Sequence, residues 1–80
     1  MQKSLFTKKY DRFRELLTEA RKKSGLTQKE LAEKISRPQS FVSKYERGER
    51  RLDVVEFLEI SKILGISPAK FLKKLEEETL

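Results

Sequence analysis

The sequence contains no cysteine and no histidine, and only two of its 80 residues are aspartates. Without cysteine, neither a disulfide bond nor a thiolate metal site can form. Without histidine, the chain lacks the commonest general base and the commonest metal ligand. The sequence therefore predicts no metal, no cofactor and no enzymatic activity. It also fits the reducing environment of the cytoplasm.

Long apolar runs are also missing, so we expect no membrane-spanning segment, and the first ten residues have no apolar core of the kind a signal peptide needs. No segment alternates polar and apolar residues between turn signals, which argues against a β-sheet. What remains is a chain of 36% hydrophobic and 40% charged residues, with the hydrophobic residues spaced in helical patterns. Its length suffices for one domain with a modest core.

The formal net charge of +6 favours a polyanionic partner, and nucleic acid is the first candidate. The alternative is that the charge only keeps a small protein soluble. Charge alone leaves both interpretations open.

Apolar spacing and capping signals predict five helices. The first covers about 10–24 and ends at Gly25, and the second begins with the capping box of Thr27 and Glu30. The third begins near Pro38 and runs to residue 46 or 47. The fourth opens with a second capping box, and the fifth follows a serine–proline pair. We expect an all-α domain at 10–76, with an N-terminal extension at 1–9 and a C-terminal tail at 77–80.

Two segments resemble the Cro/repressor-type (Xre-like) helix-turn-helix family: "LTQKELAEKI" and "QSFVSKYERGER". The resemblance continues through "LGISP" and covers about residues 13–72. It implies a compact five-helix lambda-repressor-like domain that binds DNA, with the helix-turn-helix motif at about 28–47 in the second and third helices. One position departs from the family pattern, because Ser36 stands where family members usually have glycine. The turn must then place a serine in left-handed geometry, and the docking angle of the third helix is the property we expect to differ.

The resemblance implies that Gln39 points into the major groove, where a glutamine amide can pair with the N6 and N7 edge of adenine. Helical spacing predicts more polar side chains on the same face of the third helix: Ser40, Ser43, Lys44 and Arg47. The alternative is a face that is only solvated. By the same spacing Phe41, Val42 and Tyr45 lie opposite and belong to the core, and Glu46 is predicted to be structural.

Other side chains are predicted to contact the DNA backbone. The resemblance assigns Gln28 to a phosphate beside the start of the second helix, although the capping box alone also explains that start. Arginines around the third helix suit phosphates or the edge of the minor groove, and two of them, Arg50 and Arg51, could equally form surface ion pairs with Glu49 or Asp53. These arginines are Arg37, which ranks lowest, and Arg47, Arg50 and Arg51.

A single recognition helix contacts few base pairs, so we expect a homodimer that reads a near-palindromic operator in double-stranded DNA. The residues predicted at the dimer interface are Ile60, Ile63, Phe71, Leu72 and Leu75, unless they close the core of the monomer. The predicted function is transcriptional repression. The alternative is an antitoxin or restriction–modification controller subunit that binds its own operator and a protein partner.

Overall fold

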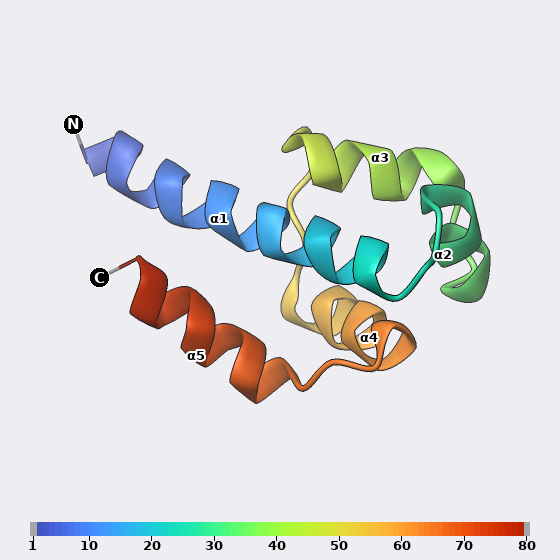
Figure 1. Ribbon diagram of the computed structural model, residues 1–80. Helices are drawn as coiled ribbons and strands as arrows, with labels where there is room; N and C mark the ends of the chain where they lie inside the picture. The colour runs from blue at the N-terminus through green and yellow to red at the C-terminus, as the bar shows by residue number, and fades with distance from the viewer. Residues whose placement is uncertain (1, 80) are drawn as a thin grey trace.

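The computed structural model describes the backbone of residues 2–79 and the side chains of residues 8–79. Within this part of the chain there are five helices and no strand, so the prediction of an all-α five-helix fold is confirmed. The helices are α1 (Gln2–Lys23), α2 (Gln28–Lys34), α3 (Gln39–Arg47), α4 (Val54–Leu64) and α5 (Pro68–Glu78) (Figure 1).

Helix α1 begins earlier than the sequence pattern predicts. The apolar stripe starts at Tyr10, but the helical backbone starts at Gln2. Neither glycine nor proline occurs before Gly25, so nothing in the sequence interrupts the helix. Most side chains of the predicted extension at 1–9 lie outside the described residues.

The predicted caps fix the starts of the later helices. Thr27 Oγ1 accepts a hydrogen bond from Glu30 N at 3.0 Å, and Glu30 Oε1 accepts one from Thr27 N at 2.9 Å. Asp53 and Glu56 make the equivalent pair at 2.8 and 3.0 Å. Both capping boxes are therefore confirmed, and each satisfies two backbone donors that a helix start leaves open.

The core lies where α1 crosses the other helices. Figure 1 shows α1 running through the middle of the molecule, with α3 along one side and α4 and α5 along the other. Burial of each large apolar side chain stabilises the fold by about 1.5–3 kcal/mol. Phe41, Val42 and Tyr45 are all buried, which confirms their assignment to the core. The remaining members are Leu17, Leu31, Ala32, Phe57, Ile60 and Leu64.

Three phenylalanines join α1, α4 and α5. The ring centroid of Phe13 lies 5.4 Å from that of Phe57 and 5.8 Å from that of Phe71, and the last two centroids are 5.3 Å apart. These separations suit tilted and edge-to-face aromatic contacts. The closed triangle fixes the two C-terminal helices against α1.

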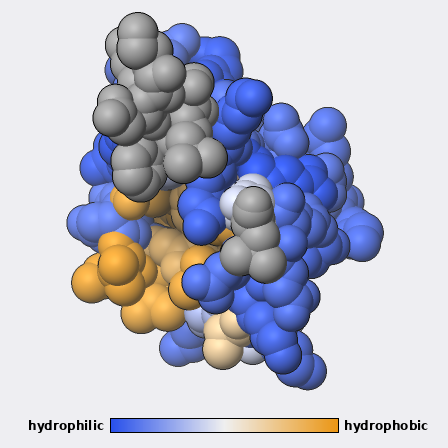
Figure 2. All heavy atoms as spheres, turned by 90° about the vertical axis from the view of Figure 1, so that its left-hand side faces the viewer, coloured by the Kyte–Doolittle hydropathy of each residue, from blue (hydrophilic) through white to orange (hydrophobic). Residues whose placement is uncertain are grey.

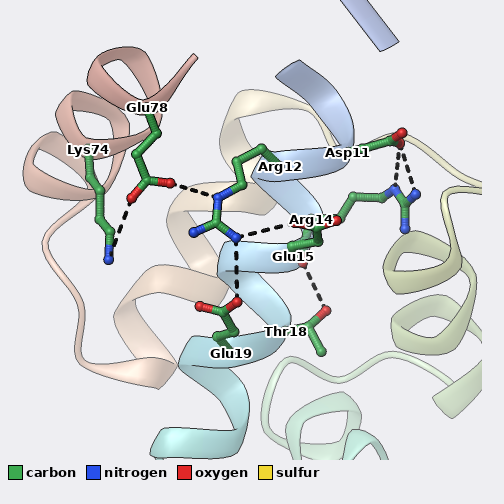
Figure 3. Close-up of polar contacts among 8 residues, drawn as sticks. All are labelled: Asp11, Arg12, Arg14, Glu15, Thr18, Glu19, Lys74 and Glu78. Atoms are coloured by element: carbon green, nitrogen blue, oxygen red, sulfur yellow. Dashed lines mark hydrogen bonds and ion pairs between the residues drawn. The ribbon is translucent and has the colours of Figure 1, made fainter. Parts of the chain in front are cut away.

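Surface charges add a second link between α1 and α5. Arg12 Nε donates to Glu78 Oε1 at 2.7 Å, and Arg12 Nη1 also reaches Glu15 on its own helix at 3.2 Å (Figure 3). Exposed ion pairs of this kind contribute little to stability. They orient the end of α5 without anchoring it as the aromatic triangle does. Among the described residues, no helix has the length and apolar character needed to cross a membrane.

Candidate nucleic-acid interface

Helix α3 has one buried face and one face open to solvent. Its apolar residues pack inward, while Gln39, Ser40, Lys44 and Arg47 are exposed. Ser43 is half-buried, and its hydroxyl donates to Ser40 O at 3.3 Å. The five polar side chains that the sequence places on one face therefore do share an accessible surface. Their contacts with DNA stay a prediction.

The turn between α2 and α3 keeps its geometry despite the serine. Ser36 has φ 58°, and it is the only residue other than glycine with positive φ among the described residues. Arg37 N donates to Ala32 O at 2.9 Å and Ser36 N donates to Glu33 O at 3.1 Å, the pattern of a left-handed helix end. Pro38 follows in extended geometry as the N-cap residue of α3, which begins at Gln39. The left-handed serine costs about 1–2 kcal/mol, which the surrounding packing must offset.

A buried ion pair ties α1, α2 and α3 together beneath this face. Glu46 accepts hydrogen bonds from Arg21 Nε at 2.7 Å and Arg21 Nη2 at 3.1 Å, and these side chains are only 6% and 10% exposed. Arg21 Nη1 also donates to Leu26 O at 2.9 Å, and Gln28 Nε2 donates to Glu46 Oε1 at 2.8 Å. We call Glu46, Arg21 and Gln28 the Glu46 cluster. Its existence supports the structural role predicted for Glu46.

Gln28 therefore lies in a different setting from the one the sequence suggests. Its amide nitrogen is directed at a buried carboxylate, and the side chain is half-buried. A phosphate contact stays a prediction, and it would have to use the remaining groups of the amide. The sequence gives no sign of the Glu46 contact, since the two residues are 18 positions apart.

A second carboxylate-centred cluster lies beside the start of α3. Glu56 accepts hydrogen bonds from Arg50 Nη1 and Nη2, both at 2.9 Å, and from Arg37 Nη1 at 3.4 Å. The guanidinium carbons of Arg37 and Arg50 lie 4.6 and 4.7 Å from the ring centroid of Phe41. We call Glu56, Arg37, Arg50 and Phe41 the Glu56 cluster. The hydrogen bonds from Arg50, helped by Asp53 N–H and Arg37, lower the pKa of Glu56 to about 2.

The other predicted arginines lie at the far end of α3. Arg47 donates to Glu49 at 2.9 and 3.0 Å, and both side chains are more than half exposed. This hydrogen bond lowers the pKa of Glu49. The guanidinium of Arg51 lies 4.4 Å from the ring centroid of Tyr10. Both arginines thus lie at the C-terminal end of α3, and exposed pairs can exchange partners at little cost.

Arg14 of α1 closes the end of α3, a role that the sequence did not reveal. Its Nη1 donates to Glu46 O at 2.6 Å. Its Nη2 donates to Asp11 Oδ1 at 2.8 Å, the contact drawn in Figure 3. The next turn places Gly48 at φ 83°, where an added Cβ would lie 2.9 Å from Arg14 Nε. Glycine is thus needed there for both its backbone geometry and its lack of a side chain.

The residues predicted for a dimer interface fall mostly inside the monomer. Ile60 is 1% exposed and Leu75 is 9% exposed, while Ile63 and Phe71 are half-buried against the core. Their burial matches the alternative in which they close the monomer core. Leu72, at 45% exposure, is the member that stays available.

Other apolar side chains on α4 are more exposed than those predicted. Val54, Val55 and Leu58 are 72%, 63% and 47% exposed. The buried side of α4 contains Phe57, Ile60 and Leu64, and this helical spacing leaves the three residues outside. Figure 2, a view toward the ends of α1 and α5, shows apolar surface gathered on one part of an otherwise hydrophilic face. Apolar residues occur on all sides of α4, so helical spacing alone does not show which of them the packing leaves exposed.

Comparisons with known proteins agree with the geometry. A family model described as helix-turn-helix matches residues 17–71. The HTH-type transcriptional regulator ImmR of Bacillus subtilis (strain 168) is 42% identical over 60 residues, which cover 75% of this chain and 47% of ImmR. The fold superposes with TM-score 0.93 and 48% identity on an XRE-family like protein from Pseudomonas syringae pv. tomato str. DC3000, over 99% of this chain and 96% of that chain. This chain thus spans about half the length of ImmR.

Proposed function

The chain belongs to the Xre-like helix-turn-helix family, and from this membership we propose that it is a DNA-binding transcriptional regulator. The observation that carries the proposal is the exposed polar face of α3. Helix-turn-helix proteins insert this second helix of the motif into the major groove. The net charge of +6 supplies the general attraction to a phosphate backbone.

In this proposal Gln39 reads base edges and the rest of the face supports it. Gln39 is exposed at the first turn of α3, where a long amide can reach the N6 and N7 edge of adenine. Ser40 and Ser43 are short and allow the helix to approach the bases closely. Lys44 can reach a guanine edge or a phosphate. Arg47 and Arg51 then hold the backbone beyond the end of α3.

We further propose that two copies read a near-palindromic operator as a homodimer and repress transcription by occluding a promoter. The side chains that support a second copy are the exposed apolar residues of α4 and α5: Val54, Val55, Leu58 and Leu72. Large exposed apolar patches favour protein contacts. Two-fold symmetry would place half-sites about 34 Å apart or a multiple of that distance. A protein of this kind works where the DNA is, which in bacteria is the cytoplasm.

Selection of bound sequences from a pool of random duplexes tests the proposal most directly. We expect enrichment of one motif repeated with inverted symmetry at a spacing near one helical turn. Failure to enrich any sequence, with binding no stronger than to random duplexes, would overturn sequence-specific recognition. Enrichment of a single, unrepeated half-site would retain DNA reading and remove the dimer.

Sedimentation at micromolar concentration tests the dimer separately. We expect a dimer on DNA, and we expect Leu58→Lys to reduce dimer formation because it places a charge in the apolar surface. Glu59→Lys is the matched control, since it adds a lysine to the same helix at a polar, exposed position. A parent protein that stays monomeric on and off DNA would exclude the homodimer.

A further inference from the structure

We propose that Glu56 and Phe41 are positioning residues that hold the Arg37 guanidinium as a contact to one DNA phosphate beside the reading end of α3. This inference rests on the proposed DNA-binding function and adds a specific device to it. On sequence alone, Arg37 is the weakest candidate among the arginines for a contact with the DNA backbone. Its surroundings in the structure reverse that order.

Arg37 is held, but most of its hydrogen-bonding capacity is left open. Its Nη1 makes a long hydrogen bond of 3.4 Å to Glu56, and its guanidinium lies 4.6 Å from the centre of the Phe41 ring. A guanidinium has five N–H donors, and Arg37 uses one of them within the described part of the chain. The side chain is 36% exposed. Stacking on the ring restricts the guanidinium while its remaining donors stay accessible.

Arg50, in contrast, makes several hydrogen bonds within the protein and holds the Glu56 carboxylate in place. It donates to Arg51 O at 2.7 Å and to both oxygens of Glu56 at 2.9 Å. Glu56 is fixed in turn because its Oε1 also accepts from Asp53 N at 3.0 Å, inside the capping box of α4. The carboxylate therefore has a set position before Arg37 reaches it. Arg50 therefore uses three of its five N–H donors for contacts within the described part of the chain, whereas Arg37 uses one.

The cluster lies next to the residues proposed to read bases. Arg37 precedes Gln39 by two positions and Phe41 follows it by two, with Pro38 and the left-handed Ser36 fixing the backbone between α2 and α3. A docked α3 would bring a neighbouring phosphate within reach of an exposed arginine at this place. Holding a long side chain before binding reduces the entropy lost on binding. Glu56 and Phe41 supply that restraint from α4 and α3.

The decisive variant is Glu56→Gln, measured by fluorescence anisotropy with a labelled duplex that carries the selected site. Glutamine can still accept from Asp53 N–H, so the cap of α4 is retained. The substitution removes a negative charge, which by electrostatics alone would strengthen DNA binding. If Glu56 positions Arg37, binding weakens instead, by about three- to tenfold. Glu59→Gln is the matched control, because it removes the same charge from an exposed position of the same helix.

Arg37 is tested by salt dependence. Arg37→Gln should reduce the slope of the logarithm of the binding constant against the logarithm of salt concentration by about 0.9, the loss of one phosphate contact. In that background Glu56→Gln should no longer weaken binding, since there is no guanidinium left to position. Arg37→Lys keeps the charge without the planar group, and we expect it to recover the slope but only part of the affinity.

Circular dichroism at the binding temperature establishes that each variant is folded. The inference is overturned if Glu56→Gln binds as tightly as the parent or more tightly, or if Arg37→Gln leaves the salt slope unchanged. A parent protein that shows no preference for any duplex refutes the proposed function instead. The salt dependence of the Arg37→Gln variant is measured without any change at Glu56. If a Glu56 variant unfolds, that measurement still tests the phosphate contact.

Discussion

The Glu46 cluster and the Glu56 cluster use the same chemistry in two different settings. In the first, Glu46 and Arg21 are 6% and 10% exposed and link three helices. In the second, Glu56 is equally enclosed at 10%, but its partners Arg37 and Arg50 are 36% and 40% exposed. The first cluster is thus enclosed at both its carboxylate and its arginine, whereas the second is enclosed at the carboxylate and open at the arginines.

The difference in the exposure of the arginines separates a cluster that stabilises the fold from one that can contact DNA. A buried arginine that loses its carboxylate keeps a charge that little water can solvate, so the closed cluster stabilises the fold. An arginine open to solvent can donate to a phosphate through the N–H groups that its carboxylate partner leaves free, so the open cluster can take part in binding. Both clusters flank α3, one near its end and one near its start. We expect substitutions to divide in the same way, into effects on stability and effects on DNA.

The largest effect on stability is expected from a substitution in the closed Glu46 cluster. Glu46→Gln leaves the charge of Arg21 buried and unpaired, and we expect it to lower the free energy of unfolding by about 3–5 kcal/mol. Glu56→Gln leaves its arginines in contact with water, and we expect a loss of about 1–2 kcal/mol. Urea unfolding of both variants measures the difference. Equal losses would mean that exposure of the arginines does not distinguish the clusters.

The second prediction concerns acid unfolding. The pKa of Glu56 lies at about 2 in the folded protein, below its ordinary value of 4.5, so its contribution to stability is complete above pH 4.5 and is lost as pH falls toward 2. We expect a loss of about 1–2 kcal/mol over this window, because the half-exposed arginines are screened by water. Urea unfolding at a series of pH values should show a shallower decline for Glu56→Gln than for the parent. If both proteins lost stability equally as pH falls, the low pKa assigned to Glu56 would be contradicted.

The third prediction compares the two glutamines of the motif. Gln39→Ala should weaken binding to the selected site by about 1–3 kcal/mol and leave binding to random duplexes unchanged, as expected for a residue that reads bases. Gln28→Ala should weaken both duplexes alike if Gln28 contacts a phosphate, and it should destabilise the Glu46 cluster by about 1.5–3 kcal/mol through the lost hydrogen bond to a carboxylate. Titrations on both duplexes, together with urea unfolding, separate the roles. Loss of sequence preference in the Gln28 variant would assign the base-reading role to Gln28 and the phosphate contact to Gln39.

The smallest effect is expected at the turn that leads into the Glu56 cluster. Ser36→Gly relieves the left-handed strain, offset in part by the extra freedom of glycine in the unfolded chain, and should stabilise the protein by about 0.5 kcal/mol. Ser24→Gly is the control, since Ser24 has no positive φ and should lose stability on the same exchange. Thermal unfolding measures both. A lower melting temperature for Ser36→Gly would show that the serine has a favourable contact that outweighs its strain.

Local rules were enough to find most of the helices. The capping boxes and the glycines after α1, α3 and α4 appear in the sequence as short patterns, and the structure follows them. The start of α1 was wrong because an apolar stripe marks where a helix meets a core, whereas the helical backbone can continue past it. Ile60 and Leu75, which the sequence predicts at a dimer interface, are 1% and 9% exposed in the monomer, because helical spacing does not show what packs against each face of a helix.

The sequence by itself determined the fold class, the exposed face of α3 and the core residues opposite it, because helical period and capping act within a few residues. Only the tertiary structure decided how each charge is used. Arg21 meets Glu46 across 25 positions and Arg37 meets Glu56 across 19, and no local pattern encodes such pairs. Whether a guanidinium is enclosed or left open depends on how the helices pack around it. For this protein that packing separates the arginine that supports the fold from the arginine proposed to hold DNA.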